Sequence, residues 1–171
     1  MKIHNITTPV DRKQLLELEA GDMVAISGEI YTARDAAHKL IVEGSEIPFD
    51  LNDLIIYYAG PSPAPHGKPI GSIGPTTSSR MDAYTPAMLS MGVAITIGKG
   101  PRSDETIEAF RKYNAVYLAA LGGAGALLAS KVNHAEIVAF SHLGPEAIYK
   151  LEVEDFPAIV AVDTKGNTIY K

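Results

Sequence analysis

VAITIGKGPRSDETIEAFRKYNAVYLAA, residues 93–120, carries the clearest structural signal in the chain. Two apolar runs of strand length, 93–97 and 115–120, stand near its ends. The second is apolar throughout, as expected of a strand covered on both faces. Between them lies a charged amphipathic helix, residues 104–113, with Ser103 as its N-cap. Strand, helix and strand in this order predict an α/β fold with parallel strand pairing.

Strand and helix patterns continue on both sides of this segment. Towards the N-terminus, apolar runs predict strands at 23–27 and 54–59, and a helix over 32–42 begins at Thr32 as N-cap. The other expected elements are an N-terminal arm with a short helix, two more helices and three closing strands, at residues 1–20, 82–91, 125–131, 134–140, 148–154 and 158–163. The closing strands follow one another without helices, which predicts an antiparallel part of the sheet.

An irregular stretch interrupts the alternation. Residues 61–75 contain five prolines, which fit neither a helix nor a central strand. The stretch could be a linker between domains or a long loop within one domain. Because an apolar pattern resumes at once and neither flank is long enough for a comfortable separate domain, we expect a loop in a single domain spanning 1–171. Long irregular loops are common places for sites.

Composition and charge exclude several classes of function. The chain has 171 residues, 46% of them hydrophobic, and no cysteine. It therefore cannot bind zinc or an iron–sulfur cluster through its own thiolates, nor use a cysteine nucleophile. A net charge of −5 argues against non-specific nucleic-acid binding. The N-terminus lacks a signal-peptide core, and no apolar run approaches the ~20 residues of a membrane span. We expect a soluble, cytoplasmic protein without nucleic-acid or membrane partners.

Positive charge is nevertheless concentrated in one part of the chain. Between residues 62 and 102 four cations, Lys68, Arg80, Lys99 and Arg102, stand against one acid, Asp82, so the segment carries +3. The segment could be a solvated surface or a site for an anion.

The sequence GPTTSSR, residues 74–80, is the first candidate for such a site. A Gly-Pro turn precedes four hydroxyl residues and an arginine, just ahead of the predicted helix at 82–91. Backbone N–H and hydroxyl groups at a helix start can cradle an anion, and Arg80 adds a bidentate fork for a carboxylate or phosphate. The same residues could instead form an ordinary capped helix start.

Two further motifs could add cations to that site. In TARDAAH, residues 32–38, Arg34 lies in the first turn of a predicted helix and could bind an anion that Asp35 or His38 orients. The alternative is an exposed Arg–Asp pair beside a structural histidine. In GKG, residues 98–100, glycines at a strand end let the backbone approach a ligand while Lys99 points into the site. The alternative is a turn with an exposed lysine.

Familiar cofactor motifs are incomplete in this chain. LGGAG, residues 121–125, stands at a strand-to-helix junction but lacks the full glycine fingerprint of dinucleotide binding. We interpret it as close packing or close backbone approach. The five histidines are scattered at spacings that match no zinc motif, so we assign no metal ligand to this chain.

Four separated blocks of the chain resemble, in order and spacing, the β subunit or C-terminal domain of class I (iron–sulfur) fumarate hydratases. These blocks are TARDAAH (32–38), GPTTSSRMDAY (74–84), GKG (98–100) and EAIYKLEVEDFPAIVAVDTKGN (146–167). The β subunit of L-tartrate dehydratase shares the framework. The resemblance extends from about residue 15 to the end. It implies an α/β fold of the swivelling β/β/α type, with mixed parallel and antiparallel sheets and helices packed on one side.

The resemblance also implies a hydro-lyase that reversibly hydrates fumarate to (S)-malate. In that family the active site forms where an α part and a β part meet. A four-iron four-sulfur cluster is held by three cysteines of the α part, in agreement with the absence of cysteine here. The isolated chain is then expected to be inactive. An assembly of α2β2 type follows from the family, and the β chain could form a homodimer.

Residue roles are carried over from the matching motifs. Thr76 is expected to be the catalytic proton-transfer residue, and Thr77 to bind a substrate carboxylate. Three cations are expected to bind the dicarboxylate substrate: Arg34, Arg80 and Lys99. Three residues are expected to support them: Asp35, His38 and Asp82.

The substrate and the class of function each leave an alternative open. TARDAAH and RMD favour fumarate over tartrate, although Ser79 stands where glycine is common in fumarases. The alternatives are the β subunit of L-tartrate dehydratase and a non-catalytic module that binds small dicarboxylates.

Overall fold

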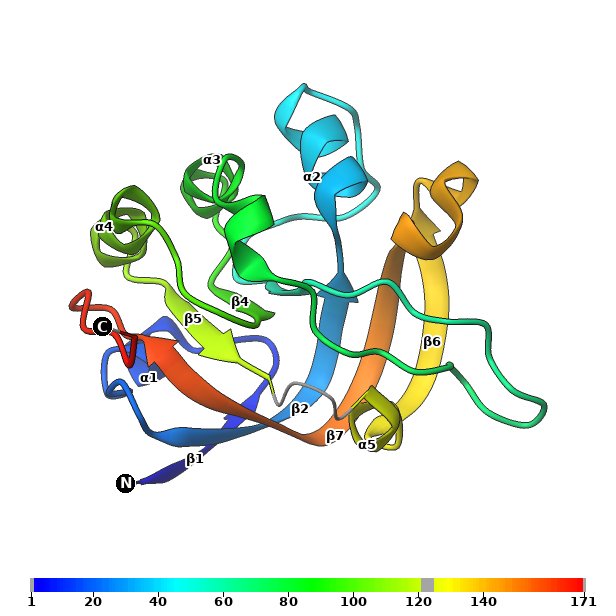
Figure 1. Ribbon diagram of the computed structural model, residues 1–171, viewed down its shortest axis with the longest axis horizontal. Helices are drawn as coiled ribbons and strands as arrows, with labels where there is room; N and C mark the ends of the chain where they lie inside the picture. Colours follow the sequence, from blue (N-terminus) through cyan, green and yellow to red (C-terminus); the bar gives the residue numbers. More distant parts are fainter. Residues whose placement is uncertain (1, 121–124, 171) are drawn as a thin grey trace.

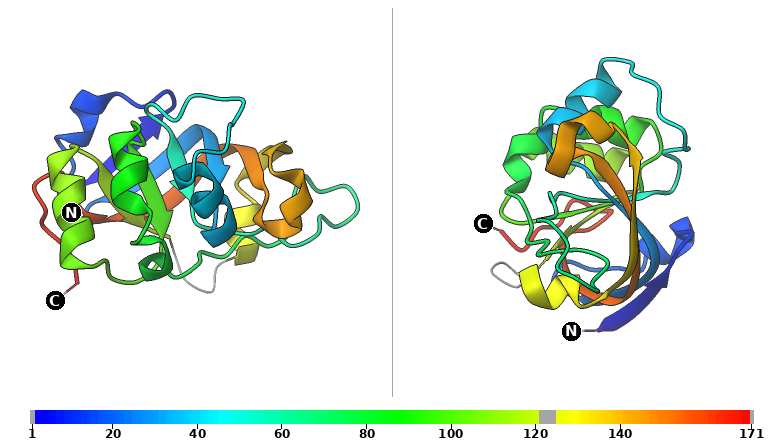
Figure 2. Two further views of the ribbon diagram at one scale, coloured as in Figure 1. Left: turned by 90° about the horizontal axis from the view of Figure 1, so that it is seen from above. Right: turned by 90° about the vertical axis from the view of Figure 1, so that its right-hand side faces the viewer.

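Two long strands, β2 (Met23–Thr32) and β7 (Ile148–Val162), run antiparallel through the molecule and organise its sheet (Figure 1). The computed structural model describes residues 2–120 and 125–170. Both strands are strongly curved, and the right-hand view of Figure 2 shows them bending beneath the helices. The edge strands β1 (Ile3–Thr7) and β6 (Val132–Ala139) pair with β2 and β7 respectively.

Three short parallel strands close the sheet into a ring. β3 (Ile55–Tyr57) pairs with the end of β2, β4 (Ile95–Gly98) with β3, and β5 (Val116–Ala119) with β4. The second half of β7 then pairs with β5 while the strand also pairs with β2, so no free edge is left within the ring. The carboxyl ends of β2, β3, β4 and β5 consequently point the same way.

The longer helices gather on one side of this ring (Figure 1). They are α2 (Asp35–Val42), α3 (Thr85–Ser90) and α4 (Asp104–Lys112), accompanied by the short 3-10 helices η1 (Ser78–Met81) and η2 (Ser141–Glu146). The short helices α1 (Arg12–Leu15) and α5 (Gly125–Ala129) lie away from this group. The expected α/β class with a mixed sheet is confirmed.

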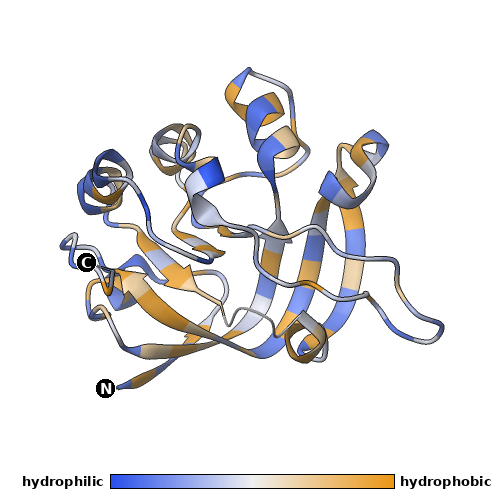
Figure 3. Ribbon diagram, viewed as in Figure 1, coloured by the Kyte–Doolittle hydropathy of each residue, from blue (hydrophilic) through white to orange (hydrophobic). Residues whose placement is uncertain are grey.

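Strand alternation divides the core between the inside of the ring and its helix-covered outside. In β3 and just after it, Tyr57 joins the inner cluster while Ile56 and Tyr58 join the outer one. Figure 3 shows β5 and the second half of β7 as mostly hydrophobic, whereas β6 and the first half of β7 alternate. Strands in the ring are covered on both faces, and the extension of the sheet has one face open.

Several expected boundaries move because pairing partners far along the chain decide them. The strands predicted at 148–154 and 158–163 are one strand, bent at Asp155, which adopts a positive φ of 53°. The first residues of the expected N-terminal arm form β1, which pairs with β2. The helix predicted at 82–91 is shorter: α3 spans Thr85–Ser90, with Pro86 in its first turn, where a proline is tolerated, and η1 ends before the predicted range begins.

Thr32 is a strand residue and not the predicted N-cap. β2 continues through it because it pairs with β3, and its buried hydroxyl accepts a hydrogen bond from the Tyr149 amide (3.1 Å). Arg34 occupies the cap position of α2 without a side-chain bond to the helix. The predicted cap of α4 is confirmed, since Ser103 Oγ accepts from the Thr106 amide.

Within residues 2–120 and 125–170, none of the helices has the length and apolarity that crossing a membrane would require.

We expect Gly28→Ala to lower the free energy of unfolding by about 2 kcal/mol or more. Gly28 lies at the register shift of β2 with a φ of 117°, and a Cβ there would stand 2.0 Å from Thr8 Oγ1. Gly21→Ala is the matched control, because Gly21 also has a positive φ (98°) but open space around it. Urea denaturation of both variants separates the steric effect from the backbone strain. Equal losses would refute the close contact.

Candidate functional site

The carboxyl ends of β2 and β4 bring two of the sequence motifs, TARDAAH and GKG, to one edge of the sheet. Residues 76–78 of the third motif, GPTTSSR, are laid across this edge. The Thr76 amide donates to the Tyr58 carbonyl oxygen (2.7 Å), and the Ser78 amide donates to that of Lys99 (2.8 Å). Thr77 forms a parallel bridge with Lys99. The structure therefore brings Thr76 and Thr77 next to Lys99, as the resemblance implies.

Side chains in this segment divide between the interior and the open face. Thr77 is exposed, Thr76 half-buried and Ser78 buried. Ser78 packs against Gly98, where a Cβ would stand 2.0 Å from its Oγ and 2.7 Å from the Tyr58 ring. Lys99 follows Gly98 and is exposed. Gly98 thus leaves room for the buried side chain of Ser78, while Thr77 and Lys99 stay exposed and Thr76 half-buried.

Arg80 and Asp35 link this segment to the start of α2. Arg80 Nε and Nη2 stand 3.2 and 3.1 Å from Asp35 Oδ2. Their side chains are 50% and 34% exposed, so the pair contributes little to stability. Asp35 therefore does orient Arg80, and an incoming carboxylate can compete for the guanidinium at modest cost.

Arg34 stands beside Asp35 and carries an unusual polar atom. Its Nε is buried, yet it has no hydrogen-bond partner among the described residues, and neither has Asp35 Oδ1. A Cβ on Gly60 would lie 2.9 Å from Arg34 Nη1. Unsatisfied buried polar atoms are rare and call for an explanation such as a ligand or a functional role. The guanidinium is held against a glycine at the end of β3, at the same edge as the threonines.

His38 lies inside the molecule, one turn into α2. It is 1% exposed, its Nδ1 stands 2.8 Å from the Arg34 carbonyl oxygen, and its ring meets the edge of Tyr58. Burial lowers the pKa of His38 to about 4. A neutral ring next to a carbonyl must carry its proton on Nδ1 and donate it. His38 thus supports the backbone of Arg34 and does not face the open site.

Asp82 is directed away from the open face as well. Its Oδ1 accepts from Arg102 Nε (2.7 Å) and its Oδ2 from the Ser103 amide (2.9 Å). The Arg102 side chain is fully buried, so it belongs to the interior and not to a surface anion site. Lys68 lies in the loop at 61–75. Of the four cations counted between residues 62 and 102, only Arg80 and Lys99 lie at this edge.

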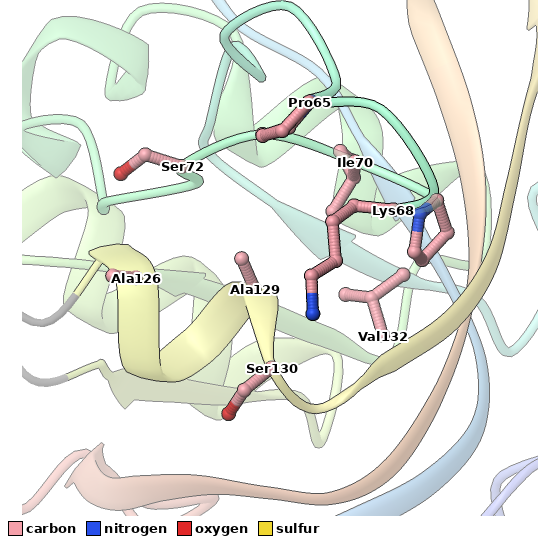
Figure 4. A pocket seen from close by; sticks show the side chains of 10 residues that line it. Pro65, Lys68, Ile70, Ser72, Ala126, Ala129, Ser130 and Val132 are labelled. Carbon is pink, nitrogen blue, oxygen red and sulfur yellow. The ribbon is translucent and has the colours of Figure 1, made fainter.

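Thr77, Arg80 and Lys99 of the candidate site are exposed to solvent. Four cavities lie elsewhere, and none of these four is lined by the threonines or cations of this edge. The largest of the four, about 390 Å³, lies between the loop at 61–75 and α5. Figure 4 shows Lys68 and Ile70 of the loop opposite Ala129 of α5 and Val132.

In the part of the chain that the structure describes, no group of three or more His, Cys, Asp or Glu side chains could hold a metal ion. Residues 121–124 of the LGGAG motif lie outside the described residues, so the interpretation as a close backbone approach stays a prediction for them. At Gly125 the close approach is confirmed, because a Cβ there would stand 2.3 Å from Ser72 Oγ and 3.0 Å from the Gly74 nitrogen.

Two polar residues of this region were missed by sequence reasoning. Ser78 was counted as one hydroxyl among four, and Tyr117 as part of an apolar strand, yet they contact each other beneath the edge (2.8 Å between hydroxyl oxygens). A tyrosine in an otherwise aliphatic strand was the available signal, because a buried phenol hydroxyl usually finds a partner.

We expect stability to fall with acidification through His38. Its folded pKa of about 4 lies below the unfolded value of about 6.5, so between these pH values the unfolded chain binds a proton that the folded chain refuses. Lowering the pH from 7 to 5 should therefore cost about 2 kcal/mol of unfolding free energy. His38→Gln keeps a donor but cannot titrate. An equal pH dependence in urea denaturation of both proteins would contradict this assignment.

Comparison with known proteins agrees with the motifs. The family described as Fumarase C-terminus matches residues 1–171. Class I anaerobic fumarate hydratase of Escherichia coli is 43% identical over 92% of this chain and 30% of its own length. Fumarate hydratase 2 of Leishmania major is 41% identical over 97% of the chain and 31% of its own length. The chain thus spans about a third of the length of these curated relatives.

A relative of similar size carries a subunit name. The Methanocaldococcus jannaschii protein named "Putative L(+)-tartrate dehydratase subunit beta" is 44% identical over 94% of this chain and 87% of its own length. Fumarate hydratase and tartrate dehydratase names therefore both occur among the relatives. Together with the match of the family over residues 1–171, these similarities establish that the chain belongs to the Fumarase C-terminus family.

Proposed function

We propose that this chain, as one domain of residues 1–171, is the β part of a hydro-lyase that reversibly hydrates fumarate to (S)-malate. One observation carries the proposal. The carboxyl edge of β2–β4 carries two threonines and three cations: Thr76, Thr77, Arg34, Arg80 and Lys99. Thr77, Arg80 and Lys99 are exposed there, whereas Thr76 and Arg34 are half-buried. The resemblance of the motifs and the fumarate hydratase names of the relatives support it.

Binding a dicarboxylate requires positive charge at two places. Lys99 and Thr77 adjoin one another at the end of β4, and the Arg34 guanidinium lies against Gly60 at the end of β3. Arg80 reaches the same edge from η1 through Asp35. Fumarate and malate carry two carboxylates, so we assign these groups to their recognition. An arginine fork suits a carboxylate better than a point charge does.

Thr76 is the proposed proton-transfer residue. Dehydration of malate removes a proton from the carbon beside a carboxylate, and hydration returns it. A threonine hydroxyl is a weak base unless nearby positive charge stabilises its alkoxide. Lys99 pairs with Thr77, the neighbour of Thr76, and the Arg80 amide bonds to the Thr77 carbonyl oxygen. We assign the charge that stabilises the alkoxide to these two cations. The bond from the Thr76 amide to Tyr58 fixes its backbone for the transfer.

The site is incomplete without a partner. The chain has no cysteine, and its described residues form no metal-ligand group, so they do not fit an iron–sulfur cluster. We propose that an α part supplies the four-iron four-sulfur cluster and covers the open face. The name of the subunit-sized relative, "subunit beta", supports such a division.

L-Tartrate is the second candidate substrate. The tartrate dehydratase relative has the same identity range as the fumarate hydratases and is covered over most of its length. Tartrate is also a dicarboxylate, so the same cations would serve it. Initial rates on fumarate, (S)-malate and L-tartrate, measured side by side with one preparation, distinguish the two.

We expect activity only after reconstitution with a cluster-bearing α subunit under anaerobic conditions. In that complex Thr76→Val should lower kcat by about two to four orders of magnitude, because the proton-transfer hydroxyl is lost. Thr76→Ser keeps a hydroxyl and should retain much more of the rate. Arg80→Lys should chiefly raise KM for fumarate, since the bidentate fork is lost. Ser79→Ala, an exposed neighbour, is the control.

Two results would overturn parts of this proposal. Near-wild-type rates for Thr76→Val would refute the proton-transfer role. Tight dicarboxylate binding by the isolated chain, without turnover in any complex, would favour the non-catalytic binding module instead.

A further inference from the structure

One buried hydroxyl ties together the two segments that carry the proposed site. Tyr117, on β5, reaches past the end of β4 on the helix-covered side of the sheet. Its hydroxyl oxygen lies 2.8 Å from Ser78 Oγ and 2.7 Å from the Gly100 carbonyl oxygen. Ser78 follows Thr76 and Thr77, and Gly100 follows Lys99. A single side chain therefore contacts both segments from below.

The donors and acceptors of this contact can be assigned. A phenol hydroxyl has one proton, and a carbonyl oxygen only accepts. Tyr117 must therefore donate to Gly100, and the Ser78 hydroxyl must donate to Tyr117. Burial raises the pKa of Tyr117, which keeps the phenol protonated. The result is a series of two hydrogen bonds, in which Ser78 donates to Tyr117 and Tyr117 donates to the carbonyl oxygen of Gly100, next to Lys99.

Arg102 holds the tyrosine ring in place. Its guanidinium carbon lies 4.7 Å from the centre of the Tyr117 ring. The guanidinium also donates to Asp82 Oδ1 and Thr85 Oγ1, both at 2.7 Å, and to the Tyr58 hydroxyl at 3.2 Å. Tyr58 is the residue whose carbonyl accepts the Thr76 amide. The ring is thus fixed between an ion-paired arginine and the strand.

We propose that Tyr117 is a positioning residue of the candidate site: its hydroxyl fixes the segment bearing Thr76 and Thr77 against the segment bearing Lys99. The inference rests on the proposed function for its catalytic consequence. Its structural consequence, the ordering of the two segments, is independent of any substrate.

The test is Tyr117→Phe in the reconstituted complex. We expect kcat on (S)-malate to fall about tenfold or more, with KM changed much less, because misplacing a reacting group affects the transition state most. Ser78→Ala removes the hydrogen bond between the Ser78 and Tyr117 hydroxyls from the other side. It should reproduce the loss, and the double variant should be little worse than either single variant, since both changes remove one linkage.

The control for lost stability is Thr106→Val. Thr106 is 1% exposed, and its hydroxyl bonds to Ser103 on α4, apart from both site segments. It should lower the melting temperature and leave kcat unchanged. If Tyr117→Phe changes kcat no more than Thr106→Val does, or if the Ser78 and Tyr117 losses simply multiply, the inference is wrong.

A second readout needs no activity. The Ser78 amide bonds to the Lys99 carbonyl across the two segments, so its hydrogen exchange reports their contact. In the full chain, Tyr117→Phe should speed exchange at Ser78 about tenfold or more, and leave the Val160 amide, bonded to Asp22, unaffected. Unchanged exchange at Ser78 would overturn the inference. A wild-type complex without turnover would refute the proposed function, and exchange at Ser78 would then decide the Tyr117 inference alone.

Discussion

The pairing of β7 with both β2 and β5 is the constraint on which the rest of the structure depends. This pairing closes the ring, and within it the parallel pairing of β2 with β3 and of β3 with β4 sets the direction of these strands. The carboxyl ends of β2, β3 and β4 are then forced to one edge. Open α/β sheets place their ligands at such an edge for the same reason. The threonines, lysine and arginines come together because the ring leaves their loops no other place.

Two kinds of arginine follow from this arrangement. Arg34 and Arg80 lie at the edge: the buried Nε of Arg34 has no partner among the described residues, and the Arg80 guanidinium is held by the partly exposed carboxylate of Asp35. Arg102 is buried, ion-paired and stacked on aromatic rings beneath them. A buried arginine with its full set of partners gives rigidity, whereas an edge arginine can exchange its partner for a ligand. Arg102 therefore stabilises the residues beneath the site, and Arg34 and Arg80 are the arginines that can bind an anion.

Local patterns predicted the elements that local physics decides. The β4–α4–β5 unit and the Ser103 cap were predicted from periodicity and capping chemistry, and both are present. The role predicted for Thr32 was wrong, because pairing with Tyr57 of β3 carries β2 through it. Sequence also placed Arg102 among the surface cations. Its burial depends on Asp82, Thr85 and Tyr58, which lie 17 to 44 residues away.

In the candidate site, too, local motifs predicted some features, and contacts between distant residues decided the others. The motifs identified Thr76, Thr77, Arg80 and Lys99 as one group, and the structure brings their segments together. Nothing local showed that Asp82 and His38 point inward, or that Tyr117 joins two of the segments. Those facts depend on which face of a strand or helix meets the ring, and that face is set by contacts between elements distant in sequence.

The central claim is that this chain holds half of a dicarboxylate site, which a partner completes. Calorimetric titration of (S)-malate into the isolated chain and into the complex with a cluster-bearing α subunit tests it most directly. We expect no saturable heat from the isolated chain and saturable binding by the complex, weakened by Arg80→Lys. Saturable binding of equal affinity by the isolated chain would show that the site is whole without a partner and would contradict the claim.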